Sequence, residues 1–310
     1  MAATAQPQQK KTLLMTEGSI WKSILLFSVP LILGNLLQQL YNTADSIIVG
    51  NFLGSNALAA VGSSGSPIYL LIGFSQGVAV GAGVVVSQYL GAKDKKETRI
   101  AVHTSLAIAV ILGLILTVGG IAVSRSLLVW MNTPEEVLGD AVTYMKLYFG
   151  GVLFSVVYNM AAGILNAAGN SRRSVIYLAC ASITNIILDP MMIYGVGPFP
   201  EMGIAGAALA TGIGQMMQVV FYLIIYFVRP IPVHLRRSCL HFNPKIGLQL
   251  YSIGVPAVLN LALPSVLITF LNSLLAFYSQ SYIVVLGIYY KLQTFLSVSY
   301  THLTLPTIRL

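Results

Sequence analysis

Two aspartates stand out because each lies inside a long apolar segment. Asp45 follows Gln38 and Tyr41 at spacings of i, i+3 and i+7, so the three side chains share one face of a helix. The same spacing recurs in the run Ser182, Asn185 and Asp189. An ionisable side chain in such a segment costs about 2.5–3.5 kcal/mol on membrane-insertion scales, which makes each aspartate a candidate functional residue.

A third apolar segment carries Thr211, Gln215 and Gln218 at i, i+4 and i+7. At about 1.5 Å of rise per residue from the segment ends, Thr211 and both aspartates fall in the outer half of a hydrocarbon core about 30 Å thick. We therefore expect the three polar stripes to face one another or water.

Two carboxyls held together away from water can bind a proton or be bridged by sodium, and either serves to couple an ion gradient to transport. A structural interpretation stays open. In it, the Asp189-Pro190 pair ends or kinks a helix, and Asp45 bonds to a neighbouring amide.

The remaining candidates indicate no other chemistry. Lys146 is expected to extend toward the outer membrane surface, and Lys291 either lines a cavity or pairs with another segment. The sequence has no metal-binding histidine spacing, no phosphate-binding GxxxxGK[ST] motif and no nucleophile–base pattern. We expect neither an enzyme nor a nucleotide, metal or cofactor site, apart from H⁺ or Na⁺ as a coupling ion.

Composition indicates a membrane protein. Of 310 residues, 56% are hydrophobic and 8% are charged, with a mean hydropathy of +0.81. Soluble domains carry about 25% charged residues, so a soluble protein is excluded. The net charge of +8 sits in short loops rather than in a continuous stripe, which argues against nucleic acid as a partner. Cys180 and Cys239 are not expected to pair.

Eight apolar segments are predicted to span the bilayer, and basic residues fix their orientation. Thirteen of the seventeen Lys and Arg residues fall on one side, which predicts a cytoplasmic N-terminus in a bacterial cell (inner) membrane. The predicted spans cover residues 20–50, 57–90, 100–124, 141–168, 174–195, 203–228, 247–279 and 282–296.

The sequence contains a weak internal repeat. FSVPLILGNLL at 27–37 resembles SIGVPAVLNLAL at 252–263, an offset of 226 residues. A second copy of equal length would run to roughly residue 454, so the natural gene is expected to continue. The tail SVSYTHLTLPTIRL breaks the last span and resembles a translated sequencing adapter. The expected division is a cytoplasmic segment 1–19, an N-lobe 20–229, a basic linker 230–246, the start of a C-lobe 247–296 and an aberrant, non-native tail 297–310.

The runs VPLILGNLLQQLYNTADSIIVGNFLG and NIILDPMMIYGVGPFPEMGIAGAALATGIGQ resemble multidrug and toxic compound extrusion (MATE) exporters. The resemblance covers about residues 14 to 296. It implies an all-α fold of twelve helices in two lobes, and export of cationic or aromatic compounds in exchange for H⁺ or Na⁺. Small molecules and the bilayer are its implied partners, and the complete protein is expected to be a monomer.

Residues carried over from the resemblance are few. The implied ion-coupling cluster is Asp45, Asn185, Asp189 and Thr211, with Pro30 as the bend or hinge of the first helix. Gln38, Tyr41, Gln215 and Lys291 are the candidates for the substrate cleft.

Two alternatives stay open. A related flippase for lipid-linked oligosaccharides should line its cleft with several Arg or Lys residues, and here the spans offer only Lys146 and Lys291. A membrane scaffold or receptor that transports nothing would not need the Asp45–Asp189 pair.

Overall fold

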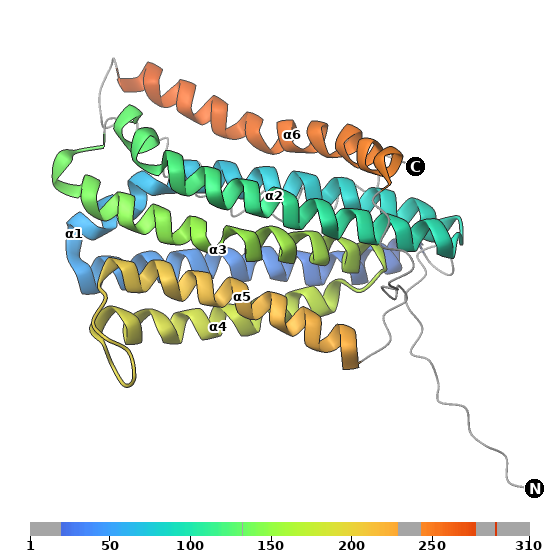
Figure 1. Cartoon of the computed structure of the whole chain (residues 1–310), viewed down its shortest axis with the longest axis horizontal. Coiled ribbons are helices and arrows are strands. Elements are labelled where there is room, and N and C mark those ends of the chain that lie inside the picture. Colours follow the sequence, from blue (N-terminus) through green and yellow to red (C-terminus); the bar gives the residue numbers. More distant parts are fainter. Residues whose placement is uncertain (1–19, 132, 229–242, 277–288, 290–310) are drawn as a thin grey trace, which may run out of the picture.

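The computed structural model describes residues 20–131, 133–228, 243–276 and 289. Those residues form long helices that lie side by side and run in alternating directions (Figure 1). The helices are α1 (Ile20–Gly91), α2 (Lys95–Trp130), α3 (Glu135–Ala167), α4 (Ser171–Tyr194), α5 (Ile204–Val228) and α6 (Pro244–Ala276).

Helix α1 contains two of the predicted spans. Its backbone leaves the helical region at Gly54, where φ is 83° and ψ is −174°, and the chain turns back along the bundle (Figure 1). That conformation is open almost only to glycine, because any Cβ would clash with the backbone. The backbone stays helical through Pro30 and Pro67, so the break falls in the gap predicted between the spans 20–50 and 57–90.

Five segments among the described residues are long and apolar enough to cross a membrane: Asn56–Gly91, Lys95–Trp130, Glu135–Ala167, Ser171–Tyr194 and Ile204–Ile224. Large apolar side chains cover their outer surface, such as Ile115 and Val118 on α2, which are 61% and 67% exposed. Such a surface suits lipid rather than water. The predicted class, an all-α membrane protein, is confirmed.

Each predicted span from the third to the sixth overlaps one helix. The seventh overlaps α6, and the eighth, 282–296, lies outside the described residues except for position 289. The α1–α2 and α3–α4 connections, which hold basic residues, lie at the same end of the bundle as the start of α1 (Figure 1). The aberrant tail 297–310 also lies outside the described residues.

Glycines bring the helix backbones into contact. A Cβ on Gly163 of α3 would lie 2.7 Å from the carbonyl oxygen of Ala79 in α1. A Cβ on Gly81 of α1 would lie 2.7 Å from the carbonyl oxygen of Leu250 in α6. Small residues at such crossings are the usual means of packing membrane helices, and here they fix α3 and α6 against α1.

Candidate functional site

Three helices contribute to one buried polar cluster. The Asn185 amide of α4 donates to Oδ1 of Asp189 at 3.3 Å and to Oγ1 of Thr211 in α5 at 3.4 Å. The Tyr41 hydroxyl of α1 also donates to Oγ1 of Thr211, at 3.5 Å. Thr211 thus connects the polar stripe of α1 to that of α4, and the faces predicted to meet do meet.

The fifth member is Asp45, which lies one turn after Tyr41 on α1. Its carboxyl is close enough to the Asp189 carboxyl for the two to interact electrostatically. Asp189 is 0% exposed, Asn185 is 1% exposed and Asp45 is 9% exposed. Two charged carboxylates this deeply buried need a compensating positive charge, because the free-energy cost of their mutual repulsion adds to the cost of removing each from water.

Several oxygens of this region have no hydrogen-bond donor among the described residues. They are Oδ1 of Asp45, Oδ1 of Asn185, Oδ2 of Asp189 and Oε1 of Gln215. Buried acceptors in native proteins are nearly always satisfied by protein groups, water or a bound ion, so these four oxygens make the cluster a candidate binding site. Carboxylate, amide and hydroxyl oxygens suit a proton or a hard cation such as sodium.

Local packing holds the cluster in place. A Cβ on Gly214 would lie 3.3 Å from the Cβ of Asn185, so glycine at this position lets α5 approach α4 closely beside the cluster. The Thr211 hydroxyl donates to the carbonyl oxygen of Ala207 at 3.1 Å, which leaves its lone pairs to Asn185 and Tyr41. Helix α4 continues past Pro190 to Tyr194, so the Asp-Pro pair does not end it.

Two buried tyrosines of α3 were not among the sequence candidates. The rings of Tyr144 and Tyr148 are 6.3 Å apart, and the Gln215 amide donates to the Tyr148 hydroxyl at 3.5 Å. The sequence did hold a signal for them, because two tyrosines four residues apart in an apolar span share one helix face. A buried tyrosine hydroxyl needs a hydrogen-bond partner, so such a face indicates a polar contact.

The other predicted site residues lie around or outside the cluster. Gln38 is partly buried one turn before Tyr41, and Pro30 lies about two turns before Gln38 on the same helix. Lys146 is exposed on α3, whereas Lys291 is outside the described residues. In the described ranges, no three His, Cys, Asp or Glu side chains gather as a metal site would require.

A membrane bundle that encloses a carboxyl pair among helices of different segments is typical of secondary transporters. The MatE family profile matches residues 30–191, and the chain belongs to the MatE family. Its relatives are transporters, not enzymes.

Similar proteins extend over most of the chain. The probable multidrug resistance protein YoeA of Bacillus subtilis is 31% identical over 85% of this chain and 58% of its own length. The multidrug export protein MepA of Staphylococcus saprophyticus is 29% identical over 90% of this chain and 61% of its own. A multidrug resistance MATE family transporter of the MOP superfamily, solved in an outward-facing conformation, has a TM-score of 0.87 and 27% identity, covering 94% of this chain and 64% of that chain. The chain thus spans about three fifths of the length of these proteins.

Proposed function

We propose that the protein acts as an antiporter that exports cationic or aromatic compounds in exchange for H⁺ or Na⁺, and that Asp45 and Asp189 bind the coupling ion. The observation that carries this proposal is the group of buried oxygens without donors around the adjoining carboxyls. A proton on one carboxyl, or a sodium ion between the two, would satisfy them and relieve the repulsion.

The charge of the interior favours cations over anionic lipid-linked sugars. Among the residues whose burial the structure describes, no lysine or arginine is buried, whereas Asp45 and Asp189 are. A flippase for pyrophosphate-linked lipids would need buried or cleft-lining basic groups to bind phosphate. The names of YoeA and MepA, a multidrug resistance protein and a multidrug export protein, support the same choice.

The orientation follows from the basic loops. We place the N-terminus, the α1–α2 connection and the α3–α4 connection in the cytoplasm, because all three hold basic residues. The start of α1 and the two connections lie at the same end of the bundle (Figure 1). The carboxyl pair would then lie in the outer half of the membrane, where it can exchange ions with the outside.

The test is export from cells that express the protein in their membrane. Asp45→Asn and Asp189→Asn should each abolish export of a fluorescent aromatic cation driven by a proton or sodium gradient. Asparagine keeps the volume of aspartate but can neither take up a proton nor neutralise sodium. Asp140→Asn, an exposed residue of α3, is the matched control and should export normally.

Membrane insertion and elution as a single species would show that the inactive variants fold. Export near the wild-type rate by both asparagine variants would make the cluster structural, and would favour a different coupling site or the scaffold alternative.

A further inference from the structure

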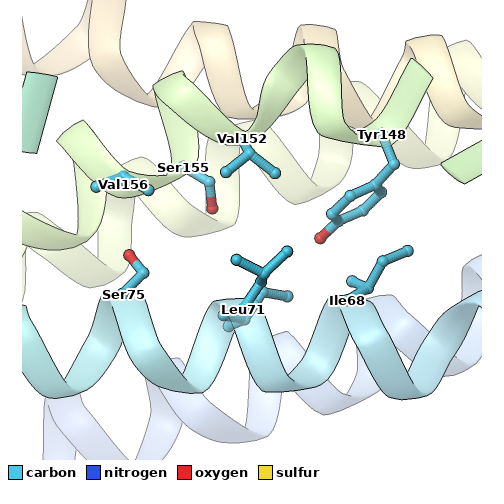
Figure 2. A pocket seen from close by; sticks show the side chains of 8 residues that line it. Ile68, Leu71, Ser75, Tyr148, Val152, Ser155 and Val156 are labelled. Carbon is cyan, nitrogen blue, oxygen red and sulfur yellow. The ribbon is translucent and has the colours of Figure 1, made fainter. Parts of the chain in front are cut away.

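The carboxyl cluster has a dry gap on one side. Figure 2 shows this gap between the second half of α1 and α3, where it begins at Tyr148 and extends toward Ser75. Most of its lining is apolar: Ile68, Leu71, Ile72, Val152 and Val156. Apolar gaps stay dry, and a bare charge is far too costly to bury in one. The gap therefore gives a cation no route along α1 and α3 to the carboxyls.

The other end of the cluster is covered by the next two turns of α1. Val49 and Phe52 follow Asp45 at i+4 and i+7, so the three side chains lie on one helix face. Val49 is 0% exposed, whereas Phe52 is 42% exposed. Phe52 lies about 10 Å beyond Asp45 along the helix axis at 1.5 Å per residue. The buried Val49 thus separates the carboxyl from a half-exposed ring.

The Phe52 ring contacts a second ring, which belongs to α4. The centroids of Phe52 and Tyr194 are 5.0 Å apart and their planes cross at 69°, an edge-to-face contact. Tyr194 is 48% exposed and lies about 7.5 Å beyond Asp189 along α4. The two helices that carry the carboxyls are therefore joined again, further out, by a pair of rings at the surface of the bundle.

Each ring is attached close to a glycine that interrupts its helix. Gly54, two residues after Phe52, has a φ of 83°. Gly195, directly after Tyr194, has a φ of 71°. The break of α1 and the α4–α5 connection lie at the end of the bundle opposite the basic connections (Figure 1). Residues at the ends of elements absorb the backbone rotation of hinge motions, so the rings can separate while the carboxyls stay in place.

We propose that the rings of Phe52 and Tyr194 form a gate over the carboxyl cluster, and that they separate when a cation passes between the cluster and the outside. In the closed gate, Val49 and the two rings shield the carboxyls from water. The proposal rests on the proposed function only in naming a cation as the species that passes. The separation of the rings can be measured without a cation gradient.

The accessibility of a cysteine below the rings tests the gate. Val49→Cys places a thiol between the cluster and the rings of the 310-residue chain, in which Cys180 and Cys239 are replaced by serine. The probe is 2-aminoethyl methanethiosulfonate, a small cationic thiol reagent, added to the purified chain in detergent. An aromatic edge contact contributes about 0.5–1.5 kcal/mol. At about 1.4 kcal/mol per factor of ten, Phe52→Ala and Tyr194→Ala should each speed the labelling about 2- to 12-fold.

Three controls separate the gate from a general loosening of the bundle. Tyr194→Phe keeps the ring and should keep the slow rate. Trp130→Ala removes an 80% exposed ring at the end of α2 and should leave the rate unchanged. Val85 is 0% exposed in the second half of α1, and a Val85→Cys reporter should stay slow in every variant.

Unchanged labelling of Val49→Cys in both alanine variants would overturn the proposal. So would an equal rise in Trp130→Ala, in Tyr194→Phe or at the Val85→Cys reporter, because the two rings would then not be what closes the site. Faster labelling confined to the alanine variants at position 49 would support the gate even if Asp45→Asn exported normally. The outcome is thus separate from that of the export test.

Discussion

Replacing Thr211 by valine removes the hydroxyl at the centre of the cluster while keeping nearly the same side-chain shape. The hydroxyl accepts hydrogen bonds from Asn185 at 3.4 Å and from Tyr41 at 3.5 Å. Both distances are near the outer limit for a hydrogen bond, so each bond contributes about 0.5–1 kcal/mol, the low end of the usual range.

Losing both bonds therefore removes about 1–2 kcal/mol of support from the ion-bound cluster. At about 1.4 kcal/mol per factor of ten, the concentration of the driving ion at half-maximal export should rise about 5- to 30-fold. The maximal export rate should change less, because both carboxyls remain. The assay is export from cells that express the protein, with the sodium or proton concentration varied.

Thr143→Val is the matched control. Its hydroxyl donates to the carbonyl oxygen of Gly139 at 3.0 Å on an exposed face of α3. This hydrogen bond involves no residue of the cluster. The control should leave the half-maximal concentration unchanged. An unchanged value in Thr211→Val, or an equal rise in Thr143→Val, would refute the role given to the Thr211 hydroxyl.

Three further predictions concern the scaffold. Gly81→Ala should lower the free energy of unfolding in detergent by about 1–3 kcal/mol, because its methyl group would press on the backbone of Leu250. Gly54→Ala should lower it by about 1–3 kcal/mol through backbone strain alone, since nothing lies within 4 Å of the new Cβ. A thiol reagent added from outside should label a Glu135→Cys variant and spare a Lys93→Cys variant, because the loop with Lys93 is placed in the cytoplasm.

Gly73→Ala adds a methyl group with nothing within 4 Å, at a helical position of α1, and should not destabilise the protein. Equal stability of Gly81→Ala and Gly73→Ala would contradict the close packing of α6 on α1. External labelling at position 93 would reverse the whole orientation. Cys180 is itself exposed and should be replaced first in the labelling experiment.

Much of the fold could be predicted because membrane helices leave a simple signal. Apolar segments long enough to cross the membrane predicted the helices. The gap between the first two predicted spans contains Gly54, where the backbone of α1 leaves the helical conformation. The helix ends were less predictable. Helix α2 extends from Lys95 to Trp130, beyond the predicted 100–124, because Asp94 caps its start by accepting from the backbone of Lys96 and Glu97 at 3.0 Å.

The site was predictable where polar residues interrupt apolar stripes. Asp45, Asn185, Asp189 and Thr211 come together because each polar face had to avoid lipid. Tyr148 was not predicted as a site residue, because a tyrosine in an apolar span cannot be told from any other large core side chain. Only the structure shows its contact with Gln215.

The most direct test of the central proposal is to count the cations bound by the purified chain at neutral pH, with sodium measured by radiotracer and protons by titration on the same preparation. We predict that the wild-type chain binds a cation that Asp45→Asn and Asp189→Asn each fail to bind, while Asp140→Asn binds it normally. Binding of as many cations by both variants as by the wild-type chain would contradict an ion site at the carboxyl pair.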